Sequence, residues 1–135
     1  MAVLADVKTV GPMFGNAQEI VRVTYDFAVD GGSIADYDVL VAGGDVIVEL
    51  MDVDVKKAVT SSDAVVIDLG KGAGGVDFWS DVVKGNLTLD AQVPSANEGR
   101  HVELSSGEKI VLGVESFAIT AGSLQFIFKC YSRQP

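Results

Sequence analysis

The sequence contains only one cysteine and one histidine in 135 residues. A single cysteine excludes an intrachain disulfide, so packing alone must stabilise the fold. A lone histidine without cysteine partners cannot supply a typical zinc site. A serine–histidine–aspartate site would need His101 as its base, and no G-x-S-x-G motif presents a serine. We therefore expect no catalytic residues, no metal and no cofactor, and a protein that is not an enzyme.

Positive charge is also scarce in this chain. Ten Lys and Arg residues face nineteen Asp and Glu residues, which gives a formal net charge of −9. Such a chain cannot easily neutralise phosphates, so nucleic acids and anionic membranes are disfavoured as partners. No apolar run approaches the ~20 residues of a membrane span, and the N-terminus lacks the basic and apolar regions of a signal peptide. We expect a soluble protein with neither nucleic-acid nor membrane partners.

Helical periodicity is limited to short stretches near residues 54–60 and 76–84. Elsewhere apolar residues alternate with polar ones, as in half-buried strands. Residues 45–55 are apolar on both faces for part of their length, which is expected of a central strand covered on both sides. Strands are predicted over residues 19–29, 37–41, 45–55, 64–69, 86–93, 102–104, 109–114, 116–120 and 123–131.

Turn residues separate these strands at intervals of about ten residues, with Ala121 and Gly122 marking the last turn. Many short strands in one small chain are typical of a β-sandwich or a barrel. We predict an all-β fold, an antiparallel β-sandwich of jelly-roll type in preference to a barrel. It should contain at most one or two short helical turns.

Residues 1–17 differ from the rest of the chain. The pairs Gly11-Pro12 and Gly15-Asn16 are turn signals, and no sustained period surrounds them. We predict either an N-terminal arm or a short edge strand over residues 1–17, and a single β domain over residues 18–135. The N-terminal segment carries apolar residues that could lie across a partner and order on binding: Val3, Leu4, Val7, Met13 and Phe14.

A glycine-rich run at residues 70–75 invites comparison with phosphate-binding loops. It lacks the G-x-x-x-x-G-K-[S/T] order, and no helix is predicted after it to hold an anion. We interpret it as a flexible loop between strands. Aspartates are also abundant, but no run matches a calcium-binding loop, so we favour solvated strand ends over a structural Ca²⁺ site. These aspartates are Asp26, Asp30, Asp36, Asp38, Asp52, Asp54, Asp63, Asp68, Asp77 and Asp81.

Two large aromatic residues, Phe78 and Trp79, stand side by side in the glycine-flanked segment that follows. The structural interpretation places both rings in the core, and we favour it because large aromatic residues usually bury. The functional interpretation makes them an aromatic contact for a protein partner or a stacking platform for a sugar. Cys130 alternates with apolar residues in the last strand, so we predict a buried structural thiol.

Four motifs in order give the sequence a family resemblance. Residues 45–50 and 65–70 form two apolar strands, residues 76–79 follow the glycine-rich run, and residues 119–131 close the chain. This order of motifs resembles that of the head decoration or cement proteins of tailed bacteriophages and their relatives. The resemblance covers residues 45–132, and it departs from the usual Gly-Asp-Gly at residues 70–72, which read Gly-Lys-Gly.

The resemblance implies an all-β protein on the capsid surface of a virion, made in the host cytoplasm. It implies binding to the major capsid protein and reinforcement of the lattice, often as a homotrimer, and it transfers no catalytic residue. An alternative from another class is a carbohydrate-binding adhesion module associated with a tail or fibre. An exposed Trp79 would favour this alternative. A small hydrolase or isomerase on a β-barrel is a third alternative, and it would depend on His101 and the central aspartates.

Overall fold

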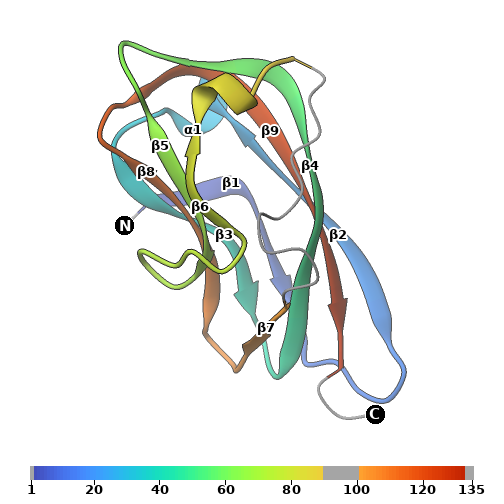
Figure 1. Ribbon diagram of the computed structural model, residues 1–135. Coiled ribbons are helices and arrows are strands. Elements are labelled where there is room, and N and C mark those ends of the chain that lie inside the picture. Colours follow the sequence, from blue (N-terminus) through green and yellow to red (C-terminus); the bar gives the residue numbers. More distant parts are fainter. Residues whose placement is uncertain (1, 90–100, 133–135) are drawn as a thin grey trace.

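The fold is a two-layered β-sandwich, described by a computed structural model for residues 2–89 and 101–132 (Figure 1). Sheet A has the strand order β1 (Ala2–Val10), β3 (Ala35–Ala42), β8 (Lys109–Glu115), β5 (Val66–Lys71) and β6 (Trp79–Val83). Sheet B has the order β2 (Gln18–Asp26), β9 (Ile119–Tyr131), β4 (Val46–Ser61) and β7 (His101–Leu104). The predicted all-β sandwich is confirmed. All neighbouring strands are antiparallel except β1 and β3, which are parallel.

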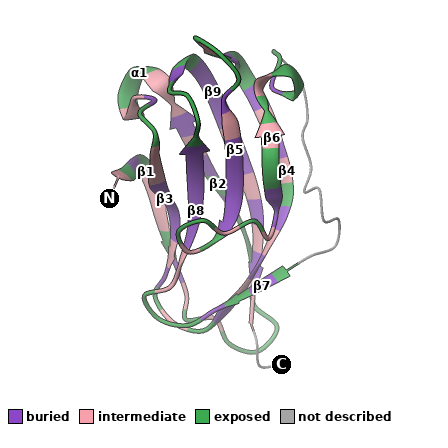
Figure 2. Ribbon diagram, turned by 60° about the vertical axis from the view of Figure 1, so that its left-hand side comes forward, coloured by how far each residue is buried: buried purple, intermediate pink, exposed green. Residues whose placement is uncertain are grey.

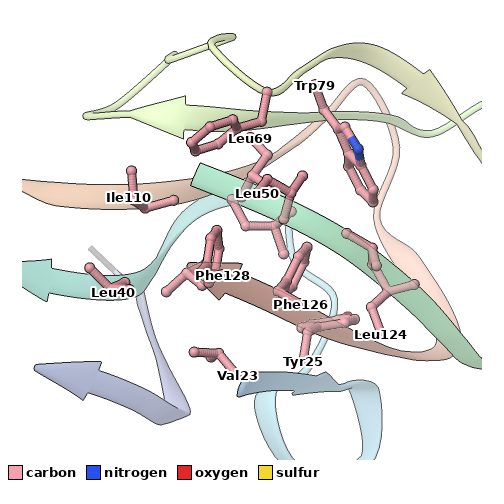
Figure 3. Packing of buried hydrophobic residues seen from close by; sticks show 14 of the residues in the cluster. Val23, Tyr25, Leu40, Leu50, Leu69, Trp79, Ile110, Leu124, Phe126 and Phe128 are labelled. Carbon is pink, nitrogen blue, oxygen red and sulfur yellow. The ribbon is translucent and has the colours of Figure 1, made fainter. Parts of the chain in front are cut away.

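The core lies between the two sheets because alternate residues of each strand point inward. On β9 the inward residues Leu124, Phe126 and Phe128 are fully buried, while the residues between them are partly exposed. Figure 3 shows these side chains packed against Leu40, Leu69 and other residues of sheet A. In Figure 2, sheet A lies in front, and its central strands β8 and β5 are mostly buried.

Local helix signals give way to strand pairing in two places. Residues 54–60 belong to β4, whose pairing with β9 continues to Ser61, and residues 79–83 form β6. The weak helical periodicity near residues 54–60 and 76–84 therefore produces no α-helix there, because cross-strand pairing outweighs weak local propensity. Among the described residues, helix is confined to α1 (Phe27–Asp30) and the 3₁₀ turn η1 (Lys84–Asn86).

The strand predicted over residues 19–29 ends earlier than expected. The carboxylate of Asp26 accepts a hydrogen bond from the N–H of Ala28 and so caps the single turn α1. The strand predicted over 86–93 is not formed where it is described: Asn86 lies in η1, and residues 90–93 lie outside the described residues.

Two further expectations about the long strands are wrong. Gly122 is not a turn but lies inside β9, where its φ of 138° and its close approach to the backbone of Val59 require a glycine. The actual turn precedes β9, at Ser116, whose φ is 70°. Strand β4 is covered on one face only: Met51, at a register shift, is exposed on the other.

Residues 2–10 form β1, at one edge of sheet A. Its register with β3 shifts between Val3 and Lys8, and Leu4 and Val10 are buried in the core. A loop of residues 11–17 then leads to β2 in the other sheet. The N-terminal segment is thus part of the sandwich in this structure.

Candidate functional site

The residues expected to contact a partner are distributed between surface and core. Val3 and Phe14 are exposed, by 54% and 74% of their surface. Val7 is half-buried, and Met13 is partly buried against the core. Leu4 is buried at 1% exposure, so it anchors β1 and offers nothing to a partner.

Phe78 and Trp79 are core residues with no exposed surface. The ring of Trp79 packs 5.9 Å from that of Phe126, and Phe78 packs 6.3 Å from Phe128, centroid to centroid. Trp79 is the first residue of β6 and Phe78 directly precedes that strand, and the Trp79 ring faces β9 across the sandwich, as Figure 3 shows for Trp79 and Phe126. Neither ring can therefore serve as a surface contact in the folded domain, and the structural interpretation of this pair is the correct one.

Cys130 and His101, the lone cysteine and the lone histidine, lie in different environments. Cys130 is buried, and desolvation, with a smaller effect of Glu19, raises the pKa of its thiol to about 12. The thiolate is therefore scarce at neutral pH. His101 is exposed at the start of the short strand β7.

A cluster of carboxylates occupies the outer face of sheet A. One oxygen each of Asp68, Asp81 and Glu115 lies within 4.8 Å of the others. Cross-strand register explains the gathering, because Gly113 on β8 is paired with both Asp36 on β3 and Asp68 on β5. Gly113 places no side chain between the acidic residues, and a Cβ there would lie 3.3 Å from an oxygen of Asp36.

The cluster is electrostatically coupled. The hydrogen bond and the charge of Asp68 raise the pKa of the Glu115 carboxyl, and Asp81 and Asp36 raise it further. Asp68 is itself buried, and its Oδ1 accepts a hydrogen bond of 2.7 Å from the N–H of Asp81. Such a group can share a proton, and its oxygens are the type that a hard cation prefers.

Sequence reasoning noticed the aspartates of this cluster but missed Glu115. Nothing along the chain joins positions 68, 81 and 115, because they meet only through strand register. The sequence contains only an indirect signal for this cluster. Asp68 interrupts an otherwise apolar strand, and such a residue must either point away from the core or form a hydrogen bond or ion pair.

The glycine-rich run forms a closed loop between β5 and β6. Asp77 Oδ2 accepts a hydrogen bond from the N–H of Lys71, and the N–H of Gly72 donates to the carbonyl of Lys109. A pocket of about 440 Å³ lies between this loop and the turn before β8, with Val111 among its lining residues.

Both lysines at this pocket are held in ion pairs. Lys71 Nζ lies 3.1 Å from Glu108 Oε2, and Lys109 Nζ lies 2.9 Å from Asp38 Oδ2. The N–H of Ser105, followed by Lys71, lowers the pKa of the Glu108 carboxyl. Lysines neutralised in this way are poorly suited to binding a phosphate.

Comparison with known proteins shows a shared fold. The chain is similar to a chain of the cyanophage Pam1 capsid asymmetric unit, with a TM-score of 0.61 and 14% identity over 91% of this chain and 90% of that one. It is also similar to a chain of the acidic stable capsid of Helicobacter pylori bacteriophage KHP30, with a TM-score of 0.59 and 12% identity over 84% and 86% of the two chains. No protein-family model and no curated protein matches the sequence. No helix in the described part of the chain has the length and hydropathy of a membrane span. The β-sandwich of this protein is thus a fold that also occurs in phage capsids.

Proposed function

We propose that this protein is a virion structural protein that binds the outer surface of a phage capsid lattice and stabilises it. The observation that carries the proposal is the similarity in fold to chains from two phage capsids. Each comparison covers most of the neighbour's own chain, so both neighbours are small capsid chains of about this length. We base the accessory role on this similarity to small capsid chains.

The surface supports a role in assembly. Exposed large apolar side chains occur at several separate places, including Val3 on β1, Phe14 in the loop before β2, and Phe117 in the turn before β9. A particle-bound subunit repeats each contact many times, so each contact needs only a modest area. The proposed partners are the major capsid protein and other copies of this chain, and the homotrimer that the resemblance implies is a prediction for the decorated lattice, to be counted on decorated heads.

The alternative of a sugar-binding adhesion module loses its main support. It depended on an exposed Trp79 as a stacking platform, and Trp79 is fully buried. No other tryptophan exists in the chain. The buried Trp79 therefore weakens this alternative relative to the capsid role.

Co-sedimentation of the protein with empty phage heads that lack it tests the proposal. We expect saturable binding and heads that resist heating to a higher temperature. Heads that neither bind the protein nor gain heat resistance would contradict the proposal.

Point substitutions can locate the contact, whereas deletion of residues 1–17 would remove Leu4 and Val10 from the core. We expect Phe14→Ser to weaken head binding while leaving the fold intact, because Phe14 is 74% exposed. The matched control is Val76→Ser, an exposed apolar residue in the loop between β5 and β6. Equal binding by both variants would exclude Phe14 from the contact.

A further inference from the structure

The four edge strands of the sandwich differ in how well they are protected. Among the described strands, the edges are β1 and β6 in sheet A and β2 and β7 in sheet B. An edge strand presents unpaired N–H and C=O groups that can pair with another chain. Proteins usually interrupt, shorten or cover such strands.

Three of these edges carry recognisable protection. Strand β1 has a register shift, and the N–H of Ala5 donates to Asp30 Oδ1 at 2.8 Å. Strand β6 contains Asp81, whose φ of 54° bends it and whose N–H is bound by Asp68. Strand β7 is only four residues long.

Strand β2 is the exception. It has nine residues and pairs with β9 from end to end without a register shift. In Figure 1 it runs down the right-hand side of the molecule beside β9. It is therefore long and regular, which are the two properties that a pairing edge requires.

Hydrogen bonds show which backbone groups of β2 point away from β9. The N–H groups of Thr24 and Asp26 donate to the carboxylates of Asp6 and Asp30, at 2.7 and 2.9 Å. Because successive residues of a strand point their N–H groups to opposite sides, Ile20 and Arg22 share this outward direction.

The upper half of this edge is thus capped by carboxylates, and the lower half is open. Among the residues that the structure describes, no hydrogen bond engages the outward backbone groups of Gln18, Ile20 or Arg22. All three residues are exposed, and Ile20 has 47% of its surface accessible.

We propose that this open half of β2, residues 18–22, pairs in antiparallel fashion with the same segment of a second copy. A two-fold axis at Ile20 brings the two Ile20 side chains together and sets each Arg22 opposite Gln18 of the other copy. Glu19 then lies opposite Val21. The register centred on Ile20 is the one in which residues 18–22 pair with one another along the whole open segment, and registers centred on Glu19 or on Arg22 would oppose like charges. The pairing extends sheet B across both copies, and it does not depend on the proposed capsid role.

The net charge of −9 on each copy opposes this association at long range. Salt screens that repulsion but leaves backbone hydrogen bonds in place. We therefore expect a weak dimer whose population rises with protein concentration and with salt.

Disulfide cross-linking tests the contact and its register. Ile20→Cys places two thiols at the two-fold axis, where paired Cα atoms lie about 5.5 Å apart, within disulfide range. The matched control is Met51→Cys, an exposed residue of sheet B that is not on an edge strand. Under mild oxidation we expect about tenfold more covalent dimer from Ile20→Cys. Equal cross-linking of the two variants overturns the proposal.

A proline substitution separates pairing from folding. The N–H of Ile20 points away from β9, so Ile20→Pro removes the outward donor without removing a hydrogen bond of the β2–β9 ladder. In analytical ultracentrifugation we expect wild type and Ile20→Val to dimerise at high concentration, while Ile20→Pro stays monomeric with a near-normal melting temperature.

Two other results would overturn the proposal. A trimeric mass that Ile20→Pro leaves unchanged would show that copies associate through other surfaces. A monomeric wild type whose Ile20→Pro variant fails to bind phage heads would show that the edge takes a strand from the capsid instead. Failure of head binding with an intact Ile20-dependent dimer would count against the proposed function alone.

Discussion

At the scale of single residues, Trp79 contributes most clearly to the core. Its ring is fully buried and packs against Phe126 between the sheets. Trp79→Ala should lower the free energy of unfolding by about 3–5 kcal/mol, because it removes buried contacts and leaves a cavity. Chemical denaturation followed by circular dichroism measures this change. The neighbouring Ser80→Ala, at an exposed position, is the control and should change stability by less than about 0.5 kcal/mol.

Glu115 gives the protein a pH dependence of defined sign. Asp68, with smaller effects of Asp81 and Asp36, raises the pKa of Glu115 above its ordinary value of 4.5. A group with a raised pKa in the folded state favours folding when protonated, and this stabilisation is lost as the pH rises through the folded pKa. Relative to wild type, Glu115→Gln should therefore be more stable at neutral pH, and the difference should shrink toward pH 4.5.

Melting temperatures of the two proteins, measured in parallel across this range, test the prediction. The difference between them is the informative quantity, because other carboxyls act in the opposite direction. Burial raises the pKa of Asp6, but its hydrogen bonds to Lys8 and Thr24 together lower it below its ordinary value, and hydrogen bonds also lower the pKa of Glu108. Both carboxyls therefore lose stabilisation on acidification. A difference that stays constant with pH would contradict the coupling of Glu115 to Asp68.

At the scale of elements, the loop between β5 and β6 depends on glycine where it folds back on the strand. A Cβ at Gly70 would lie 2.5 Å from the N of Asp77 and 2.6 Å from the carbonyl carbon of Gly75, both backbone atoms that cannot move independently. We expect Gly70→Ala to destabilise the fold by about 1–3 kcal/mol or more, as in other overpacked sites.

Thermal unfolding of Gly70→Ala beside Gly85→Ala measures this effect. Gly85, in η1, has no atom within 4 Å of an added Cβ, and its φ is not in the left-handed region. This control should therefore be close to neutral. Similar melting temperatures for both variants would mean that the loop can open without loss of packing.

The strands themselves could largely be predicted from the sequence, because alternation of apolar residues reports the buried face directly. Val21, Val23 and Tyr25 on β2 are all buried as their spacing indicates. The ends of strands were harder to predict where a side-chain hydrogen bond sets them. Asp26, for example, ends β2 because its side chain caps α1. Gly122 shows the same difficulty, since its role depends on the proximity of Val59 on another strand.

The candidate sites could be predicted much less well, because they arise between strands distant in sequence. The carboxylates of Asp68 and Glu115 meet only through the register of β5 with β8. The open edge of β2 likewise follows from sheet order and from the capping of its upper half by Asp6 and Asp30. None of these relations is encoded in a local motif.

At the scale of the whole molecule, the net charge and the ion pairs predict opposite effects of added salt on the stability of the fold. The ion pairs Lys8–Asp6, Lys56–Asp54 and Lys71–Glu108 have partly accessible side chains, and such surface pairs contribute little to stability. The net charge of −9 instead destabilises the compact state by self-repulsion. Screening should therefore help this protein more than it harms it.

We accordingly expect the melting temperature to rise when NaCl is increased from low concentration to about 0.5 M. The double variant Asp81→Asn with Glu115→Gln reduces the net negative charge from −9 to −7 and removes two members of the carboxylate cluster, so it should gain less from salt than wild type. Differential scanning calorimetry in NaCl and in KCl measures both responses and checks that they do not depend on the cation. A melting temperature that falls with salt would mean that the ion pairs stabilise the fold more than the excess negative charge destabilises it. The excess negative charge also opposes formation of the β2 dimer. If that charge has only a weak effect, added salt would not promote the dimer.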